Sequence, residues 1–233
     1  MTSLPARRLV LLALAGFSLL GSVLPAAPRI TPARPRGIDP ALETLNHTGP
    51  AVWPAAITRV AILPLHDNHG TLLPASLDQF DQVWARALDA TQRAEFVSVS
   101  RSAARDLFGR DPWESTTALR PGWTDRLAAA TGAQAVFFVD ITSLKPYPPL
   151  ALGFRIKLVR LSDATVLWAS DEYWDSQNAQ HAERMKLYQR KFLVRDRVGD
   201  GGVALTQSPS LFASCAFNWT LRTLPPRFVS ELP

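Results

Sequence analysis

Apolar residues occur along this chain in short runs separated by helix-like and loop-like stretches. Residues 59–65 and 135–141 are almost wholly apolar, which is typical of strands that are covered on both faces. Residues 96–99 alternate between apolar and polar positions, as half-buried strands do. Because residues 135–141 are apolar at nearly every position, we expect that strand to lie centrally in a sheet.

Residues 154–161 and 165–170 form the clearest pair of strands. In the first of them, alternate residues from Phe154 onward are apolar until the pattern changes phase at Val159. Residues 162–164 read as a turn, so the sequence predicts a β-hairpin here.

Helical periodicity separates the strands, and capping residues mark where helices begin. Ser76 with Gln79 three positions later has the pattern of a capping box, and apolar residues up to Leu88 fall on one helical face. Ser100 or Ser102 would cap a second helix, which reaches Phe108 and ends at Gly109.

Three further helices are expected after residue 120. Thr124 would cap a helix that ends at Gly132, and a charged helix covers residues 179–192. Ser208 followed by Pro209 has the pattern of an N-cap with proline at the first helical position. The order of elements predicts an α/β (α+β) fold: one two-layer or three-layer domain whose mixed sheet has about four to five strands and a C-terminal hairpin.

The first residues have the pattern of an export signal. Arg7 and Arg8 precede an apolar stretch at residues 9–24, and small residues follow at 25–27, so we expect cleavage after Ala26. An uncleaved anchor stays open as an alternative, because a spanning helix needs roughly 17 to 25 apolar residues.

The expected organisation has four parts. They are a signal peptide or anchor at residues 1–26, a linker rich in proline and arginine at 27–56, an α/β core at 57–176 and a C-terminal helical extension at 177–233. The basic linker residues could lie near anionic lipid, which would bring the N-terminus close to a membrane.

Composition, charge and cysteine content limit the class of protein and its partners. With 47% hydrophobic and 19% charged residues, the 233-residue chain has the composition of an ordinary soluble domain. Removal of residues 1–26 takes away Arg7 and Arg8 and no acidic residue, so the net charge falls from +5 to +3. We therefore expect no nucleic-acid partner. Cys215 is the only cysteine, so no internal disulfide can form.

Four segments carry a resemblance to a known group of bacterial proteins. They are residues 59–65, 96–101, 132–139 and 161–168, and their order and spacing make the match. The chain resembles the envelope proteins around the CsgG curli-secretion lipoprotein and the amino-terminal domain of TolB. That group includes exopolysaccharide export lipoproteins and lipoprotein activators of penicillin-binding proteins.

The resemblance implies an exported adaptor that acts by contact in secretion, polysaccharide export or control of cell-wall synthesis. Its partners would be envelope proteins or further copies of itself as a homo-oligomer, with no catalytic residue and no cofactor. It would lie in the periplasm or at the outer membrane, or be anchored in the inner membrane with a periplasmic domain. The chain departs from the group in lacking a lipid-attachment cysteine, and in having Ala164-Thr165 where the group usually has Thr-Gly.

The contact residues that we predict come from one loop and one basic helix. The helix could meet an acidic partner or a polyanionic glycan, and a merely solvated helix face is the alternative. The same basic region continues to Arg195 and Arg197. The candidates are Trp113, Arg184, Lys186, Arg190 and Lys191.

An enzymatic or metal-binding function is the alternative hypothesis. His66 and His69, with Asp67 between them, could be two or three ligands of a metal-binding protein or a metal-dependent hydrolase, although a further ligand would have to come from His47 or His181. Four acidic residues around the second hairpin strand could also supply a general acid and base. They are Asp163, Asp171, Glu172 and Asp175.

Overall fold

A computed structural model describes residues 45–70, 72–109, 113–118, 121–193 and 204–227, all within a unit that spans residues 35–233. The predicted export signal at residues 1–26, the first part of the linker, Arg195 and Arg197 lie outside the described residues. The described residues form a mixed sheet with helices packed on it, which confirms the predicted fold class.

In the described part of the chain the sheet has seven strands, in the order β1-β7-β6-β5-β2-β4, with β3 beside β5. Strands β4, β2 and β5 run parallel, whereas β5, β6, β7 and β1 pair antiparallel. The strands are β1 His47–Thr48, β2 Arg59–Ile62, β3 His66–Asp67, β4 Glu95–Ser98, β5 Ala135–Lys145, β6 Ala151–Arg160 and β7 Val166–Asp175. Five of them are longer than two residues, in agreement with the expected four to five.

The predicted central strand and the predicted hairpin are both present. β5 lies between β6 and β2, and its first seven residues are all buried, so its predicted central place is confirmed. The predicted hairpin is β6 and β7, joined by a turn in which Ala164 has a positive φ of 56°. The register shifts between Leu158 and Val159, where the sequence pattern changes phase.

The helices begin where local capping chemistry allows. They are α1 Pro74–Asp89, α2 Arg101–Phe108, α3 Trp123–Thr131, α4 Ala179–Tyr188, α5 Ala204–Gln207 and α6 Pro209–Leu221, and the π-helix η1 Gln189–Leu193 continues α4. The Ser100 side chain accepts a hydrogen bond from the Ala103 N–H at 3.1 Å, and Ser208 accepts one from the Leu211 N–H at 3.4 Å. Both predicted caps are therefore confirmed.

Two other predicted caps are wrong. α1 begins at Pro74, whose fixed φ suits the first helical turn, so Ser76 lies inside the helix and forms no capping box. α3 begins at Trp123 after Gly122, which has a left-handed φ of 75°, so Thr124 also lies inside its helix. In both cases a proline or glycine upstream sets the helix start.

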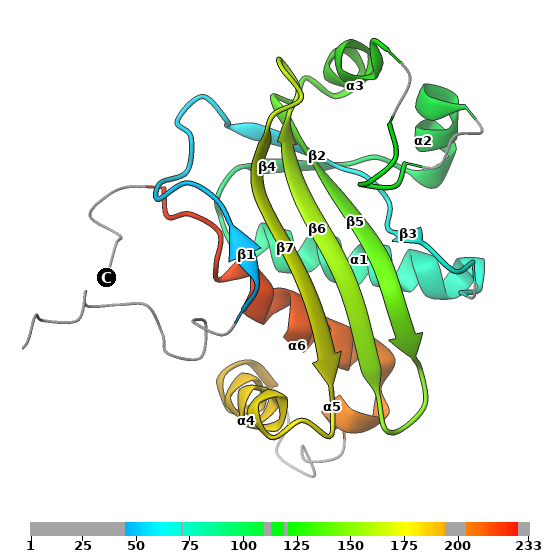
Figure 1. Cartoon of the computed structure of the whole chain (residues 1–233), viewed down its shortest axis with the longest axis vertical. Helices are drawn as coiled ribbons and strands as arrows, with labels where there is room; N and C mark the ends of the chain where they lie inside the picture. The colour runs from blue at the N-terminus through cyan, green and yellow to red at the C-terminus, as the bar shows by residue number, and fades with distance from the viewer. Residues whose placement is uncertain (1–44, 71, 110–112, 119–120, 194–203, 228–233) are drawn as a thin grey trace, which may run out of the picture. The chain divides into compact units, whose positions relative to one another are not determined.

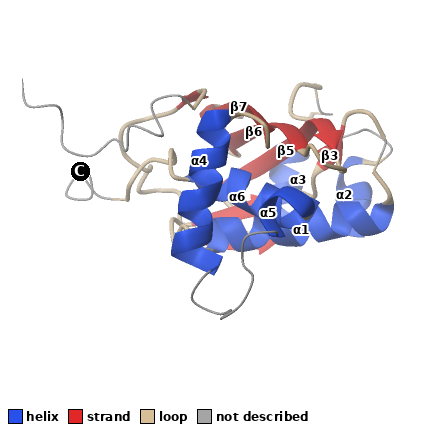
Figure 2. Ribbon diagram, turned by 90° about the horizontal axis from the view of Figure 1, so that it is seen from below, coloured by secondary structure: helices blue, strands red, loops and turns tan. Residues whose placement is uncertain are grey.

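Helices cover the two faces of the sheet unequally. Val60, Phe137 and Ile156 point to the face where α1 and α6 pack, and they belong to the larger core cluster. Ala61 and Phe138 point to the opposite face, where a smaller cluster joins the sheet to α2 and α3. Figure 1 shows α1 and α6 behind β5–β7 with α2 and α3 near one end of these strands, and Figure 2 shows α1, α5 and α6 gathered on one side of the sheet.

The folded region is larger than the predicted core. Leu45 and Trp53 belong to the larger core cluster, and Trp53 donates a hydrogen bond from Nε1 to the Ile57 carbonyl oxygen at 2.8 Å. The expected linker therefore ends well before residue 56. α6 contributes Phe212 and Phe217 to the same cluster, so this helix is part of the core and not an extension beside it. Among the described helices, none combines the length and apolar character needed to cross a bilayer.

Candidate functional site

The polar side chains after β2 form hydrogen bonds to nearby backbone groups and to β5. Both carboxylate oxygens of Asp67 accept backbone N–H groups, from His69 at 3.1 Å and from Leu72 at 2.7 Å. The His69 ring nitrogen Nε2 lies 2.9 Å from the Thr142 carbonyl oxygen. Within the described residues, no group of three or more His, Cys, Asp or Glu side chains could hold a metal ion. His66 and Asp67 thus form β3 beside β5, and the Asp67 carboxylate holds the turn that contains His69.

The acidic residues of the second hairpin strand engage separate partners. Asp163 lies 3.0 Å from Arg160, and Asp171 lies 2.9 Å from Arg155. Glu172 is buried and accepts a hydrogen bond from the Asn46 N–H. The arrangement differs from a pair of carboxylates that face one substrate, which the acid–base hypothesis requires.

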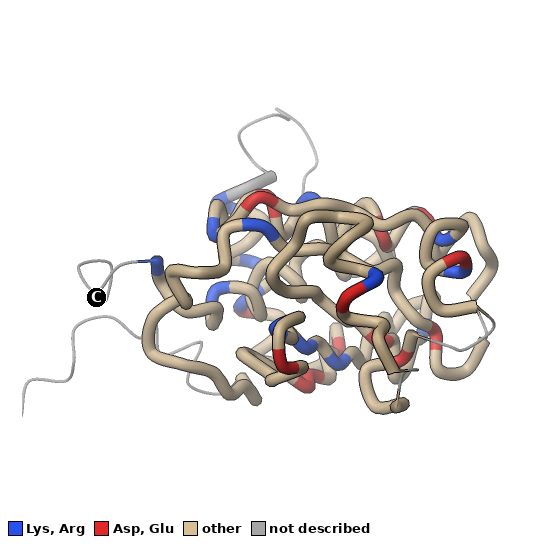
Figure 3. Tube along the Cα trace, turned by 90° about the horizontal axis from the view of Figure 1, so that it is seen from above, with Lys and Arg blue, Asp and Glu red and all other residues tan. Residues whose placement is uncertain are grey.

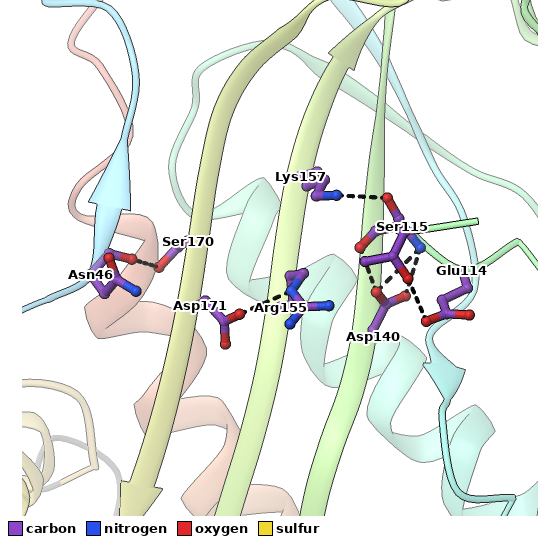
Figure 4. A network of polar contacts seen from close by, with 9 residues as sticks. Asn46, Glu114, Ser115, Asp140, Arg155, Lys157, Ser170 and Asp171 are labelled. Carbon is purple, nitrogen blue, oxygen red and sulfur yellow. Dashed lines mark hydrogen bonds and ion pairs between the residues drawn. The ribbon is translucent and has the colours of Figure 1, made fainter. Parts of the chain in front are cut away.

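A polar network lies on the sheet face opposite α1 and α6 (Figure 4). Asp140 of β5 is fully buried and accepts hydrogen bonds from Ser115, from the backbone N–H at 3.1 Å and from Oγ at 2.5 Å. Burial raises the pKa of the Asp140 carboxyl, although the Ser115 hydrogen bonds oppose that shift. Lys157 of β6 donates from Nζ to the Ser115 carbonyl oxygen at 2.7 Å. This network ties residues 113–118 to the sheet.

Trp113 takes part in the same attachment. Its Nε1 donates to the Pro64 carbonyl oxygen at 2.7 Å, and its ring centroid lies 6.5 Å from that of Phe108. It packs against the smaller core cluster as a partly buried side chain. The structure therefore gives Trp113 a packing role, in place of the free surface position that the sequence favoured.

The predicted basic helix has two faces. Arg184 is only 4% exposed, and its guanidinium carbon lies 5.4 Å above the ring of Trp174. We therefore assign Arg184 to the core, because the helical repeat turns it inward with Met185 and Tyr188. Lys186 points outward and lies 2.7 Å from Glu183 one turn earlier.

The remaining candidates, Arg190 and Lys191, line a groove between three helical segments. The groove has a volume of about 580 Å³, within the range of known ligand sites. The end of α1, the α4–η1 segment and the end of α6 form its walls. The lining residues are Ala87, Ala90, Thr91, Arg93, Leu187, Tyr188, Arg190, Lys191, Asn218, Trp219, Leu221 and Arg222. We call this the three-helix groove.

The floor of the three-helix groove is apolar because its polar atoms bond inward. Trp219 donates from Nε1 to the Arg184 carbonyl oxygen at 3.0 Å. The Tyr188 hydroxyl lies 2.9 Å from the Ser214 hydroxyl. Burial raises the pKa of Tyr188, so this side chain stays neutral at physiological pH. The floor thus offers ring faces and aliphatic carbon to an occupant.

The rim of the groove is positive. Arg93, Arg190, Lys191 and Arg222 line it, and none of the lining residues that the structure describes is acidic. Elsewhere in the described chain, positions of both signs are interspersed along the tube (Figure 3). The sequence indicates Arg190 and Lys191, which are neighbours in a basic stretch, but it does not indicate Arg93 and Arg222. These two come from helix ends that are distant in sequence.

The comparisons with known proteins bear on the fold alone. No family model matches the chain, and no curated protein matches its sequence. Three of the solved structures that are similar come from bacterial proteins. The PelC dodecamer from Paraburkholderia phytofirmans has a TM-score of 0.48 and 16% identity, and the match covers 79% of this chain and 99% of that chain. The lipoprotein GNA1162 from Neisseria meningitidis has a TM-score of 0.38 and 13% identity, and the match covers 61% of this chain and 99% of that chain. The LpoB C-terminal domain from Salmonella enterica has a TM-score of 0.35 and 18% identity, and the match covers 51% of this chain and 83% of that chain.

The TM-scores lie below 0.5 and the identities below 20%, so no function passes from these proteins to this chain. One of these similar structures, GNA1162, is a lipoprotein, and the likeness to it concerns the fold alone. The narrower resemblance to CsgG and TolB stays a prediction.

Proposed function

We propose that this chain is an exported bacterial envelope protein that acts by binding another protein at the three-helix groove, without catalysis. The observation that carries the proposal is the groove itself, with its apolar floor and its rim of four cations. Leu187 lines the groove and is 43% exposed, so it adds accessible apolar surface to that of the floor.

Two further observations support a binding role. The N-terminal sequence has the pattern of an export signal, which supports a location in the periplasm or at the outer membrane, or an inner-membrane anchor with a periplasmic domain. Two acidic residues of β7 that were candidates for acid–base chemistry engage separate partners, since Asp171 pairs with Arg155 and Glu172 accepts from the Asn46 N–H. The protein would then serve secretion, polysaccharide export or cell-wall synthesis as an adaptor, or assemble with further copies of itself.

Cross-linking in living cells tests this proposal. A photoreactive amino acid is placed at position 187 of the full-length protein, and the matched control carries it at Leu73, which is 71% exposed at the other end of α1. α1 has 16 residues, so Leu73 at its start lies about 24 Å along the helix axis from the end of α1 that lines the groove. We expect a protein adduct at position 187 that is weaker or missing at position 73.

The mass of the adduct identifies the kind of partner. A product of twice the chain mass would indicate self-assembly, and a different mass would indicate an adaptor bound to another envelope protein. A chain that is irradiated at position 187 and gives no protein adduct would contradict the proposal.

A further inference from the structure

The two edges of the described sheet are finished differently. At one end of the strand order β1 lies against β7, and the Asn46 carbonyl oxygen accepts from the Asp171 N–H at 3.1 Å. At the other end β4 is the last of the described strands. Proteins usually cover, charge or interrupt an edge strand, because its backbone groups can pair with another chain. Beyond β4, therefore, the described sheet has room to gain a strand.

The hydrogen bonds from β4 toward β2 show which of its backbone groups point outward. The N–H groups of Glu95 and Val99 both donate toward β2, each at 2.8 Å. In a parallel pair such bonds are evenly spaced and come from alternate residues of a strand. The N–H and C=O groups of Phe96 and Ser98 therefore point away from β2. Ser98 is exposed and Phe96 is half-buried, so this edge faces solvent.

An extended polypeptide is the occupant that these outward groups match. N–H and C=O groups that recur at every second residue have the spacing that a neighbouring strand supplies. Recognition by strand addition takes its affinity from main-chain hydrogen bonds and its specificity from pockets for alternate side chains. A glycan does not present donors and acceptors with this repeat.

A groove beside β4 offers a pocket for one such side chain. It lies between α1, the end of β4 and the start of α2, and it has a volume of about 440 Å³. We call it the β4–α1 groove. Ser98 lines it together with Asp78, Asp81 and Ala85 of α1. Because paired residues of neighbouring strands share a face of the sheet, a residue paired with Ser98 would direct its side chain toward this groove.

The charged residues of the β4–α1 groove favour a basic side chain. Among its described lining residues they are Asp78, Asp81 and Arg101. Arg101 lies 2.7 Å from Asp81 and 3.3 Å from Asp78. The Asp78 side chain is 63% exposed, whereas that of Arg101 is 18% exposed. One guanidinium thus faces two carboxylates, and the outer carboxylate is accessible to a second cation.

We propose that the outer edge of β4 binds an extended segment of a partner protein as an added strand, with a lysine or arginine side chain in the β4–α1 groove beside Asp78. The main chain of the segment pairs with the outward groups of Phe96 and Ser98. The β4–α1 groove shares no lining residue with the three-helix groove, so this is a second binding surface that goes beyond the proposed function.

Peptide selection with a matched pair of variants tests the inference. A random peptide display library is selected on the full-length protein and counter-selected on Ser98→Pro, which removes an outward N–H and leaves the bonds toward β2 in place. We expect peptides that survive the counter-selection to contain Lys or Arg and to bind Ser98→Pro at least about tenfold more weakly than the unchanged protein. Ser98→Ala keeps the N–H and should bind them within about twofold of the unchanged protein.

Methylation of the peptide amides distinguishes an added strand from other bound conformations. Each backbone nitrogen of a selected peptide is methylated in turn, and fluorescence anisotropy measures the affinity for the full-length protein. We expect losses of at least about tenfold at every second position and changes within about threefold between them, because alternate amides of an added strand face β4.

A second pair of variants tests the charge of the groove. Asp78→Asn should weaken binding of the selected peptides by about threefold, since it removes an exposed partner of their basic side chain. Asp106→Asn makes the same change in net charge at an exposed position of α2 that does not line the groove, and it should change binding by less than about twofold. Circular dichroism establishes that each variant is folded.

Four results would overturn the inference. No peptide survives the counter-selection, or methylation gives no two-residue period, or Asp78→Asn binds as tightly as Asp106→Asn. The fourth is a solution mass of the unchanged protein that is twice that of Ser98→Pro, which would show that a second copy occupies the edge. Cross-linking at position 187 concerns the three-helix groove, so an adduct there would leave the proposed function standing while this inference fails.

Discussion

Glu172 of β7 and Asn46, which lies 126 positions earlier in the chain, are joined by a hydrogen bond of 2.5 Å from the Asn46 N–H to Oε1 of Glu172. The Asn46 carbonyl oxygen accepts in turn from the Ser170 hydroxyl at 2.8 Å. These contacts hold β1 against the edge of the sheet. They also leave a carboxylate buried with only 8% of the residue exposed.

The buried Glu172 makes stability depend on pH. Burial raises the pKa of Glu172 from an ordinary value of 4.5 to about 7, against the opposing effects of the Asn46 hydrogen bond and of Arg184. Because the folded protein holds this proton more tightly, its contribution to stability is complete below pH 4.5 and is lost as the pH rises through 7. Glu172→Gln should therefore stabilise the protein by up to about 3 kcal/mol at pH 8 and leave it nearly unchanged at pH 4.5.

Urea unfolding of both proteins at pH 4.5 and pH 8 measures this difference. Glu95→Gln is the matched control, because Glu95 is exposed and lies 3.6 Å from Arg59, and we expect a change within about 0.5 kcal/mol at both pH values. Equal stabilities of Glu172→Gln and the unchanged protein at pH 8 would show that Glu172 is not desolvated.

Two serines that the sequence suggests as helix caps differ in the structure. Ser100 caps α2 through its side chain, so Ser100→Ala should lower the free energy of unfolding by about 1 kcal/mol. Ser76 lies inside α1, where alanine is a better helix former, so Ser76→Ala should be neutral or slightly stabilising. Denaturant unfolding of the two variants measures both changes, and a comparable loss in both would restore the capping box at Ser76.

The attachment of residues 113–118 to the sheet depends on Ser115. Ser115→Ala removes the Oγ donor to the buried Asp140 carboxylate, which should cost about 1–3 kcal/mol of stability. Thr116→Ala is the control, because Thr116 is exposed beside it and should change stability by no more than about 0.5 kcal/mol. Thermal unfolding of the two variants gives the comparison, and equal effects would argue against a special role for Asp140.

Cys215 should be chemically inert in the folded protein. It is fully buried on α6, and burial raises the pKa of its thiol to about 12. Since the thiolate is the reactive form, a thiol reagent at pH 8 should label the native protein very slowly. In denaturant it should label one thiol per chain. Rapid labelling of the native protein would mean that α6 opens readily from the core.

Much of the fold follows from short stretches of sequence. The apolar run of β5, the alternation of β6 and the change of phase at Val159 each depend on neighbours a few residues away. The caps at Ser100 and Ser208 also depend on donors three positions along the chain. Local patterns of this kind can be read without knowing what packs against them.

The candidate site could be predicted only in part, because residues that are far apart in the chain form it. Arg190 and Lys191 belong to a basic stretch that the sequence displays, but the sequence does not show that Arg93 and Arg222 reach the same groove. Nor does it show that Arg184 turns into the core over Trp174.

The five longer strands, the hairpin, the export pattern and most helix ends can therefore be predicted from the sequence, because each arises from periodicity or capping among near neighbours. Only the tertiary structure decided that Leu45 and Trp53 join the core, that Glu172 is desolvated beside Asn46 and that three helix segments bring four cations around one apolar floor. These features depend on contacts between residues far apart in the chain, and burial and electrostatic fields are set by such contacts.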